Sequence, residues 1–198
     1  MYDYIRGTLT ELNPADVTLE AGGIGYHILI SLTTYSKLQK GGRESVKLYL
    51  HQHLREDEEL LFGFFDKEER IMFRHLISVS GIGPGTARMM LSSMTPDEVY
   101  NAIVTQDVNR IKSVKGIGMK TAQRVILELQ DKIGKGASVA GFPFDGGVAP
   151  SAVRQEAATA LVLLGFTKPN VEKALDKLLK EDPSVALEEL IKKALKLL

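Results

Sequence analysis

The sequence of 198 residues contains no cysteine. Without cysteine the protein forms neither disulfides nor thiolate metal sites, which fits a cytosolic protein. No apolar run approaches the roughly 18 residues that a membrane span requires. The opening residues, MYDYIRGTLTEL, lack the apolar core of a secretory signal. These absences together predict a cytoplasmic protein that does not bind a membrane.

Histidine is scarce, and the four histidines of the chain do not form a metal-binding pattern. His51 and His53 stand two residues apart on an expected strand, which would point both rings to one face. No acidic or third ligand supports a site there, so we predict no metal site. The sequence shows no catalytic triad and no cofactor motif either, and we predict a protein without catalytic site or cofactor.

The formal net charge is zero, yet the charges are distributed unevenly along the chain. Residues 1–62 carry 6 Lys/Arg and 9 Asp/Glu, which gives a net charge of −3. Residues 110–132 carry 6 Lys/Arg and 2 Asp/Glu, which gives a net charge of +4. A basic segment of this kind predicts a polyanionic partner.

Residues 1–63 have the pattern of a small β domain. The segments YIRGTLTEL and VTLEAGGIGYHILIS alternate apolar and polar residues, and NPAD between them supplies a turn. Two further strands are expected at residues 45–54 and 60–64, with the acidic segment REDEE between them. Short strands at this spacing are typical of a barrel or sandwich, and the length fits a five-stranded oligonucleotide-binding (OB) barrel.

Residues 64–133 change to the helical period. Asp66 is the expected N-cap of the first helix, and Glu69, three residues on, would complete a capping box. Thr95 is the expected N-cap of a later helix, with Glu98 in its first turn. These signals predict a helical segment directly after the β domain.

The end of the chain divides into a linker and a second helical segment. Residues 134–150, GKGASVAGFPFDGGVAP, have no periodicity and are rich in glycine, which predicts a flexible linker. Residues 151–198 predict three short helices, the first capped by Ser151. So small a bundle has a thin core, and we expect it to gain stability from a partner.

One short pattern occurs twice in the helical segment. Residues 79–87 read VSGIGPGTA and residues 114–122 read VKGIGMKTA, an offset of 114 − 79 = 35 residues. A helix is expected before and after each copy. The repeat therefore predicts that one helix-hairpin-helix unit is used twice.

The residue types of the repeat suit a bound phosphate. Glycine tolerates positive φ, and the start of the next helix exposes free backbone N–H groups and a positive dipole end. Such a corner binds anions, phosphate above all. Ile82 and Ile117 are expected to point inward, while the Lys120 ammonium and Thr121 hydroxyl add a charge and a donor. The candidate residues are Gly81, Ile82, Gly83, Gly85 and Thr86 in the first hairpin, and Gly116, Ile117, Gly118, Lys120, Thr121 and Arg124 in the second.

Two nucleotide-binding motifs do not fit this repeat. A P-loop needs a different glycine spacing before its Lys-Thr pair. A dinucleotide fingerprint follows a strand, whereas both glycine hairpins follow expected helices. The remaining alternative is that the hairpins are only tight turns between helices, but two copies beside a basic cluster favour phosphate binding.

With these motifs the sequence resembles the RuvA family, the DNA-binding subunits of the bacterial Holliday-junction branch-migration machine. The resemblance covers essentially the whole chain: MYDYIRGTL resembles the opening strand, GGIGYHI the next hairpin, REDEELLFGF the end of the barrel and AATALVLLGF the C-terminal domain. It implies an α+β multidomain fold. The implied parts are an OB-fold barrel at 1–63, a tandem helix-hairpin-helix domain at 64–133, a flexible linker at 134–150 and a three-helix (UBA-like) domain at 151–198.

The resemblance also implies partners and roles. It implies a homotetramer, or two tetramers as an octamer, that holds a four-way DNA junction open and planar in recombination and repair. The C-terminal domain would recruit RuvB, the ATP-driven motor, and the RuvC resolvase would be a further partner. Glu56 and Asp57 would form an acidic pin that keeps strands apart at the crossover. Three residues are candidates for the motor contact, although packing within the small bundle explains them as well: Leu161, Leu164 and Phe166.

Two positions depart from the family, and two other functions stay open. Gly85 stands where the family commonly has lysine, and Met119 stands where a basic residue is common. The first hairpin is therefore expected to bind phosphate through backbone amides alone. The sequence leaves open a DNA-gripping module of a tandem helix-hairpin-helix nuclease or ligase, and a protein-interaction scaffold. The absence of an acidic metal cluster and of an adenylation lysine motif argues against the first.

Overall fold

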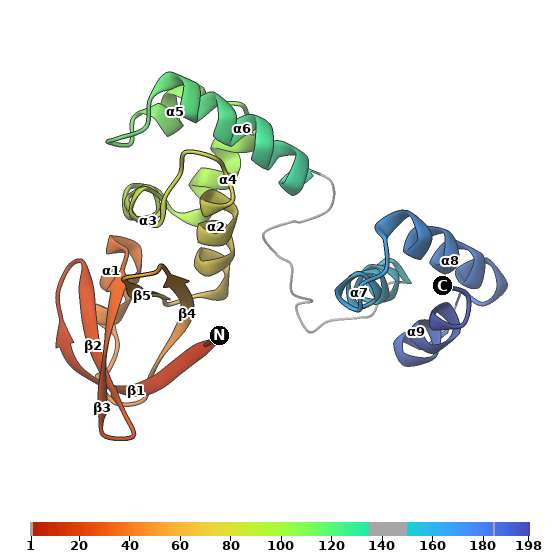
Figure 1. Cartoon of the computed structure of the whole chain (residues 1–198), viewed down its shortest axis with the longest axis horizontal. Coiled ribbons are helices and arrows are strands. Elements are labelled where there is room, and N and C mark those ends of the chain that lie inside the picture. The colour runs from red at the N-terminus through yellow and green to blue at the C-terminus, as the bar shows by residue number, and fades with distance from the viewer. Residues whose placement is uncertain (1, 135–149, 184) are drawn as a thin grey trace. The chain divides into compact units, whose positions relative to one another are not determined.

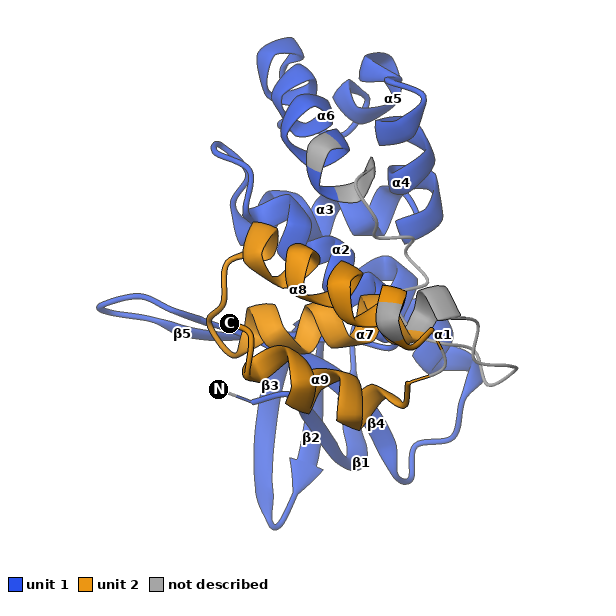
Figure 2. Cartoon of the chain, turned by 90° about the vertical axis from the view of Figure 1, so that its right-hand side faces the viewer, with its two compact units in different colours: residues 1–141 blue, residues 142–198 orange. Residues whose placement is uncertain are grey.

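The computed structural model describes residues 2–134, 150–183 and 185–198. The chain forms two compact units, residues 1–141 and 142–198, which Figure 2 shows in different colours. Each unit buries its own set of apolar side chains. The first unit contains a barrel and a group of helices, and the second contains helices.

Five strands of the first unit close into a barrel in the order β1-β2-β3-β5-β4. They are β1 (Tyr4–Leu12), β2 (Asp16–Ala21), β3 (Ile24–Ile30), β4 (Val46–Leu54) and β5 (Glu59–Phe64). Strand β3 runs parallel to β5, and the other neighbouring pairs are antiparallel. Alternate residues point inward and fill the barrel, among them the fully buried Val17, Leu19, Ile28 and Leu48. The predicted OB-type barrel is therefore confirmed.

A helix that the sequence did not predict, α1 (Leu32–Lys40), lies between β3 and β4. Its N-cap is Ser31, whose hydroxyl accepts from the Thr34 backbone N–H at 3.0 Å. The Thr33 hydroxyl donates to the Leu91 carbonyl at 2.6 Å. Because Leu91 lies on a helix outside the barrel, this hydrogen bond joins the barrel to the helical part of the unit.

Between residues 67 and 134 the structure describes five helices: α2 (Lys67–Ile77), α3 (Pro84–Ser93), α4 (Pro96–Val104), α5 (Val108–Lys112) and α6 (Met119–Gly134). Figure 1 shows α2 leading from the barrel into the other four helices. The Phe73 ring on α2 packs against the rings of Phe62 and Phe64 on β5, with centroid separations of 5.1 and 4.9 Å. The last strand of the barrel and the helices therefore share one apolar core.

One of the two predicted helix starts is confirmed in detail, and the other is wrong in its capping. The Thr95 hydroxyl accepts from the Glu98 N–H at 3.3 Å, and the Thr95 N–H donates to the Glu98 carboxylate at 2.8 Å. This is a reciprocal capping box. The box predicted for Asp66 and Glu69 does not form, although Asp66 is the N-cap of α2. Asp66 pairs with Lys37 instead, and Glu69 turns into the interior.

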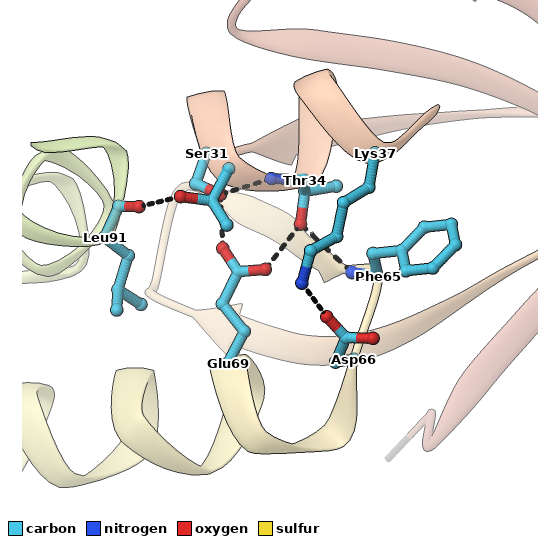
Figure 3. Close-up of polar contacts among 8 residues, drawn as sticks. Ser31, Thr34, Lys37, Phe65, Asp66, Glu69 and Leu91 are labelled. Carbon is cyan, nitrogen blue, oxygen red and sulfur yellow. Dashed lines mark hydrogen bonds and ion pairs between the residues drawn. The ribbon is translucent and has the colours of Figure 1, made fainter. Parts of the chain in front are cut away.

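Glu69 is buried where α2 meets α1, as Figure 3 shows. Its carboxylate accepts from the Ser31 hydroxyl and, at 2.8 Å, from the Thr34 hydroxyl. The Thr34 hydroxyl in turn accepts from the Phe65 backbone N–H at 3.0 Å. Burial raises the pKa of Glu69, against the lowering effect of the two hydroxyl groups. This network holds the barrel and the helices in one arrangement within the first unit.

The second unit consists of α7 (Pro150–Leu163), α8 (Lys168–Glu181) and α9 (Leu187–Leu195). Arg154 on α7 and Asp176 on α8 form an ion pair at 2.7 Å. The three helices enclose a small apolar core that includes Ala157, Leu161, Val171, Leu175 and Leu190. The predicted three-helix bundle is confirmed.

The boundaries of this bundle differ slightly from the predicted ones. Helix α7 begins at Pro150, so Ser151 lies inside the helix and is not its N-cap. The predicted linker, residues 134–150, lies outside the described residues except for its two ends. Its first residue ends α6, and its last residue begins α7.

We expect Glu69→Ala to lower the free energy of unfolding by about 3 kcal/mol, because the Ser31 and Thr34 hydroxyl groups would lose a buried acceptor. Glu69→Gln keeps the shape and one acceptor oxygen, so its loss at neutral pH is smaller. Urea unfolding followed by far-ultraviolet circular dichroism measures both losses. Equal losses for the two variants would contradict the hydrogen-bonding role.

The same variants give a pH dependence with a defined sign. The pKa of Glu69 in the folded protein lies above its ordinary value of 4.5. The stability that this raised pKa provides is therefore complete below pH 4.5 and is lost as the pH rises through the folded pKa. We expect the advantage of the natural chain over Glu69→Gln to shrink from pH 4.5 upward. If the difference in unfolding free energy between the natural chain and Glu69→Gln stays constant with pH, the pKa of Glu69 is not raised.

Candidate nucleic-acid interface

The first glycine turn, hairpin 1 (residues 78–83), joins α2 to α3. The Ile82 N–H donates to the Val79 carbonyl at 3.0 Å and closes a four-residue turn. Gly81, the third residue of that turn, has a φ of +92°, a conformation in which a side chain is strained. Val79 and Ile82 are only 2% and 5% exposed. Apolar packing therefore holds the turn from the inside, as predicted for Ile82.

Hairpin 2 (residues 113–118) joins α5 to α6 with the same geometry. The Ile117 N–H donates to the Val114 carbonyl at 3.1 Å, and Gly116 has a φ of +89°. Ile117 is 5% exposed, like its counterpart in hairpin 1. The sequence repeat is thus a repeat in space, one structural unit used twice.

The outer face of both hairpins is open backbone. Apart from the adjoining residues and the backbone of its own helix, nothing lies within 4 Å of the place where a Cβ would stand at any of Gly81, Gly83, Gly85, Gly116 and Gly118. Gly83, the N-cap of α3, offers no capping side chain, and Pro84 after it has no N–H. The remaining first-turn amides of α3 and α6, which include those of Thr86 and Thr121, have no acceptor within their helices. They lie at the positive end of the helix dipole, an arrangement suited to an anion.

The cations around hairpin 2 differ in their partners. Arg110 on α5 forms an ion pair with Glu98 on α4 at 3.0 Å. Lys112, Lys115 and Lys120 are exposed, and none has a hydrogen-bond or ion-pair partner among the described residues. These three ammonium groups are therefore the charges available to a ligand at hairpin 2.

Two cations of α6 reach hairpin 1. The Arg124 guanidinium donates to the Ser80 carbonyl at 3.2 Å, and the Lys132 ammonium donates to the Ser78 hydroxyl at 2.8 Å. The sequence placed Arg124 with Lys120 at hairpin 2, on one face of the following helix. The contact with Ser80 was not predicted, because the two residues stand 44 positions apart and no local pattern links them.

Metal and membrane sites are not found in the part of the chain that the structure describes. No group of three or more His, Asp or Glu side chains there could hold a metal ion. The His51 and His53 rings stack with centroids 6.5 Å apart, and burial together with the charge of Arg74 lowers the pKa of His51. None of the described helices is long and apolar enough to cross a membrane.

Known protein families match most of the chain. The RuvA N terminal domain matches residues 1–63, and the RuvA C-terminal domain matches residues 152–198. A SAM-like helix-hairpin-helix tandem matches residues 73–131. This last match contains both glycine hairpins.

Curated relatives align with the chain over its whole length. A Holliday junction branch migration complex subunit RuvA from Cytophaga hutchinsonii is 52% identical over 100% of both chains. The chain belongs to the RuvA family. Subunits of the same name from Bacteroides thetaiotaomicron and Porphyromonas gingivalis are 48% and 42% identical, over 99% and 100% of each chain. RuvA membership favours the family interpretation of the hairpins over a module of a nuclease or ligase.

In this RuvA chain the acidic segment expected to form a pin lies at the tip of the β4–β5 connection. The Arg55 N–H donates to the Glu58 carbonyl at 2.8 Å and closes the loop. Glu56 and Asp57 are exposed on it, and neither forms an ion pair with another described residue. Both carboxylates are therefore uncompensated at an exposed corner of the barrel.

The three candidates for a motor contact in the RuvA C-terminal unit have different surroundings. Leu161 is fully buried, and Phe166 is half-buried against the same core, so packing explains both. Leu164 is 61% exposed and lies beside Leu163, which is 82% exposed. The exposed apolar surface at the end of α7 thus includes Leu163, a residue that the sequence did not single out.

An alanine substitution is expected to have opposite effects at Gly81, in the turn of hairpin 1, and at Gly85, in the helix that follows it. Gly81→Ala places a Cβ at positive φ, and we expect it to lower the free energy of unfolding by about 1–2 kcal/mol. Gly85 lies inside α3 with open space around it, so Gly85→Ala should raise stability by about 0.4–1 kcal/mol. Thermal or urea unfolding distinguishes the two. A stabilising Gly81→Ala would contradict the turn geometry.

Proposed function

We propose that this chain binds four-way DNA junctions through hairpins 1 and 2 and acts as the DNA-binding, non-catalytic subunit of a branch-migration complex. The observation that carries this proposal is the pair of equivalent hairpins with outward-facing backbone amides. It is supported by relatives that are 52% and 48% identical over essentially the whole chain and are named as Holliday junction branch migration complex subunits. Branch migration then serves homologous recombination and DNA repair.

The hairpins grip the sugar–phosphate backbone and read no base sequence. In each, a phosphate oxygen accepts hydrogen bonds from the first-turn amides, while the helix dipole and nearby cations attract its charge. At hairpin 1 the donors are the backbone amides of Gly83, Gly85 and Thr86, which follow the turn glycine Gly81. In hairpin 2, Gly116 and Gly118 shape the same corner, and the Lys120 ammonium and Thr121 hydroxyl add side-chain donors. The Arg124 guanidinium on the same helix is a further donor for a bound phosphate. Ile82 and Ile117 contribute by holding the turns from the inside.

A junction with four arms calls for a fourfold assembly, so we propose a homotetramer, alone or as two tetramers facing each other. Each subunit then presents one pair of hairpins to one arm. Four weak grips on one junction give avidity that a single linear duplex does not receive. Met119 and Gly85 replace basic residues at the hairpins, and this places more of the grip on the backbone amides.

The uncompensated carboxylates of Glu56 and Asp57 suit the role of an acidic pin. Four copies near the centre of such a tetramer would repel phosphates and keep the strands apart at the crossover. Their exposure and their lack of a described cation partner support this role, because a paired carboxylate would exert a weaker field.

The remaining parts of the chain serve the assembly. We infer a barrel domain at 1–63, a DNA-binding domain at 64–133, a linker at 134–150 and a C-terminal domain at 151–198 that contacts the RuvB motor. Leu163, the last residue of α7, and the exposed Leu164 after it are best suited to that contact. ATP hydrolysis belongs to the motor, since this sequence contains no nucleotide loop. The RuvC resolvase is a further partner, and the complex works in the cytoplasm.

The test of this function is the preference for branched DNA. We expect the chain to bind a four-way junction on the order of 10²-fold more tightly than a linear duplex of the same arm length. Gel shifts or fluorescence anisotropy at one fixed salt concentration measure both affinities. Equal affinities would contradict the proposal. Cleavage of the junction on addition of Mg²⁺ would instead favour a nuclease module.

The pin predicts a change in strand separation without loss of grip. We expect Glu56→Gln with Asp57→Asn to bind junctions equally or more tightly, because repulsion of phosphates is removed. The fluorescence of a 2-aminopurine base at the crossover should fall as stacking increases. Glu44→Gln, which neutralises another exposed acid of the barrel, is the matched control and should change neither quantity. Unchanged crossover fluorescence in the double variant would remove the pin assignment.

A further inference from the structure

Hairpins 1 and 2 have the same backbone conformation but differ in the charge around them. At the 35-residue offset, 116 − 81, the cations Lys115, Lys120 and Arg124 of the second repeat correspond to the uncharged Ser80, Gly85 and Met89 of the first. The sole Lys or Arg between residues 79 and 89 is Arg88. Its guanidinium donates to the Ala15 carbonyl in the barrel at 2.9 Å. The one cation of this segment thus contacts the barrel, and residues 78–83 themselves carry no charged side chain.

The structure brings a cation from the helix after hairpin 2 to this uncharged hairpin. The Arg124 guanidinium lies 3.2 Å from the carbonyl oxygen of Ser80, the residue that corresponds to Lys115. Ser80 directly precedes Gly81, so the positive charge lies beside the turn. A guanidinium carries five N–H donors in a planar fork. The contact with Ser80 uses Nη1, and the other donors stay available while the group is held in place.

A second contact fixes the same pair of elements. Lys132 lies eight residues after Arg124 on α6, about two helical turns along, and its ammonium donates to the Ser78 hydroxyl at 2.8 Å. Ser78 is the C-cap of α2 and begins hairpin 1. Burial and the charge of Lys132 both lower the pKa of the nearby His75. Helix α6 thus contacts hairpin 1 at two points, and its position relative to that hairpin is set.

We propose that Arg124 is a positioning residue for hairpin 1, where it holds the Ser80 carbonyl and supplies the positive charge that this hairpin lacks. Each hairpin then has one or more cations, Lys115 and Lys120 at hairpin 2 and Arg124 at hairpin 1, where Lys132 contacts the first residue, Ser78. The inference rests on the proposed function and deepens it, since it assigns Arg124 to one of the two phosphate sites. A rival interpretation is that the contact is only a structural clamp between two hairpins, in which the charge has no role.

The test moves the charge from Arg124 to the hairpin itself. Arg124→Gln removes the charge but keeps a donor for the Ser80 carbonyl, and we expect junction affinity to fall roughly tenfold. The slope of log K against log salt should become shallower by about 0.9, as for one phosphate contact. Ser80→Lys restores a cation at hairpin 1, in the position that Lys115 holds in hairpin 2. We expect it to recover most of the affinity and slope in the Arg124→Gln background but to add little to the natural chain.

A second pair of variants provides the control. Lys120→Gln should also lower affinity and slope, but Ser80→Lys should not repair it beyond its small effect on the natural chain, because Lys120 serves hairpin 2. Arg124→Lys, which keeps the charge, should retain most of the slope. Unfolding curves verify that each variant is folded.

Two results would overturn the inference while leaving the proposed function intact. One is an Arg124→Gln variant that loses affinity with an unchanged salt slope, as a structural clamp would. The other is a Ser80→Lys effect of equal size in every background, which would mean that Arg124 does not serve hairpin 1. If the natural chain itself did not bind DNA, the proposed function would fail and this inference would fail with it.

Discussion

The turn that is closed by a valine carbonyl and an isoleucine N–H is the constraint on which the binding surface depends. Its glycine takes positive φ, so the chain reverses within four residues while both apolar side chains stay buried. Because Ile82 and Ile117 fix the turn from the inside, the backbone that follows faces outward. The next helix therefore begins with free amides at an open corner. The same constraint applied twice, 35 residues apart (117 − 82), makes two equivalent corners from one chain.

A buried carboxylate has a comparable role at the junction between the barrel and the helices. Glu69 accepts hydrogen bonds from two hydroxyl groups of the α1 region, and one of these hydroxyls also accepts the Phe65 N–H. The desolvation that raises its pKa is the cost of placing a polar contact inside. These hydrogen bonds are directional, whereas the apolar packing around Phe73 is not. The barrel with its acidic loop and the helices with their hairpins are thus parts of one compact unit.

Local patterns in the sequence were sufficient for several of these features. The strands, the Thr95 capping box and the two hairpins each depend on residues close together in the chain, and all three were predicted. The capping box of Asp66 and Glu69 failed because Ser31 and Thr34, 38 and 35 positions from Glu69, compete for its carboxylate. Helix α1 was missed although Ser31 is a favourable N-cap. Two β-branched threonines follow it, and they resemble a continuing strand. The contact between Arg124 and Ser80 joins two repeats, and no single-repeat pattern contains it.

The most direct test of phosphate binding at the two hairpins is a structure of this chain bound to a four-way junction, at a resolution that places individual phosphate oxygens. The account predicts a phosphate oxygen within hydrogen-bond distance of the first-turn amides after each hairpin, at Gly85 or Thr86 and at Lys120 or Thr121. Both corners lying far from any nucleotide, with the DNA held by another surface of the chain, would contradict it.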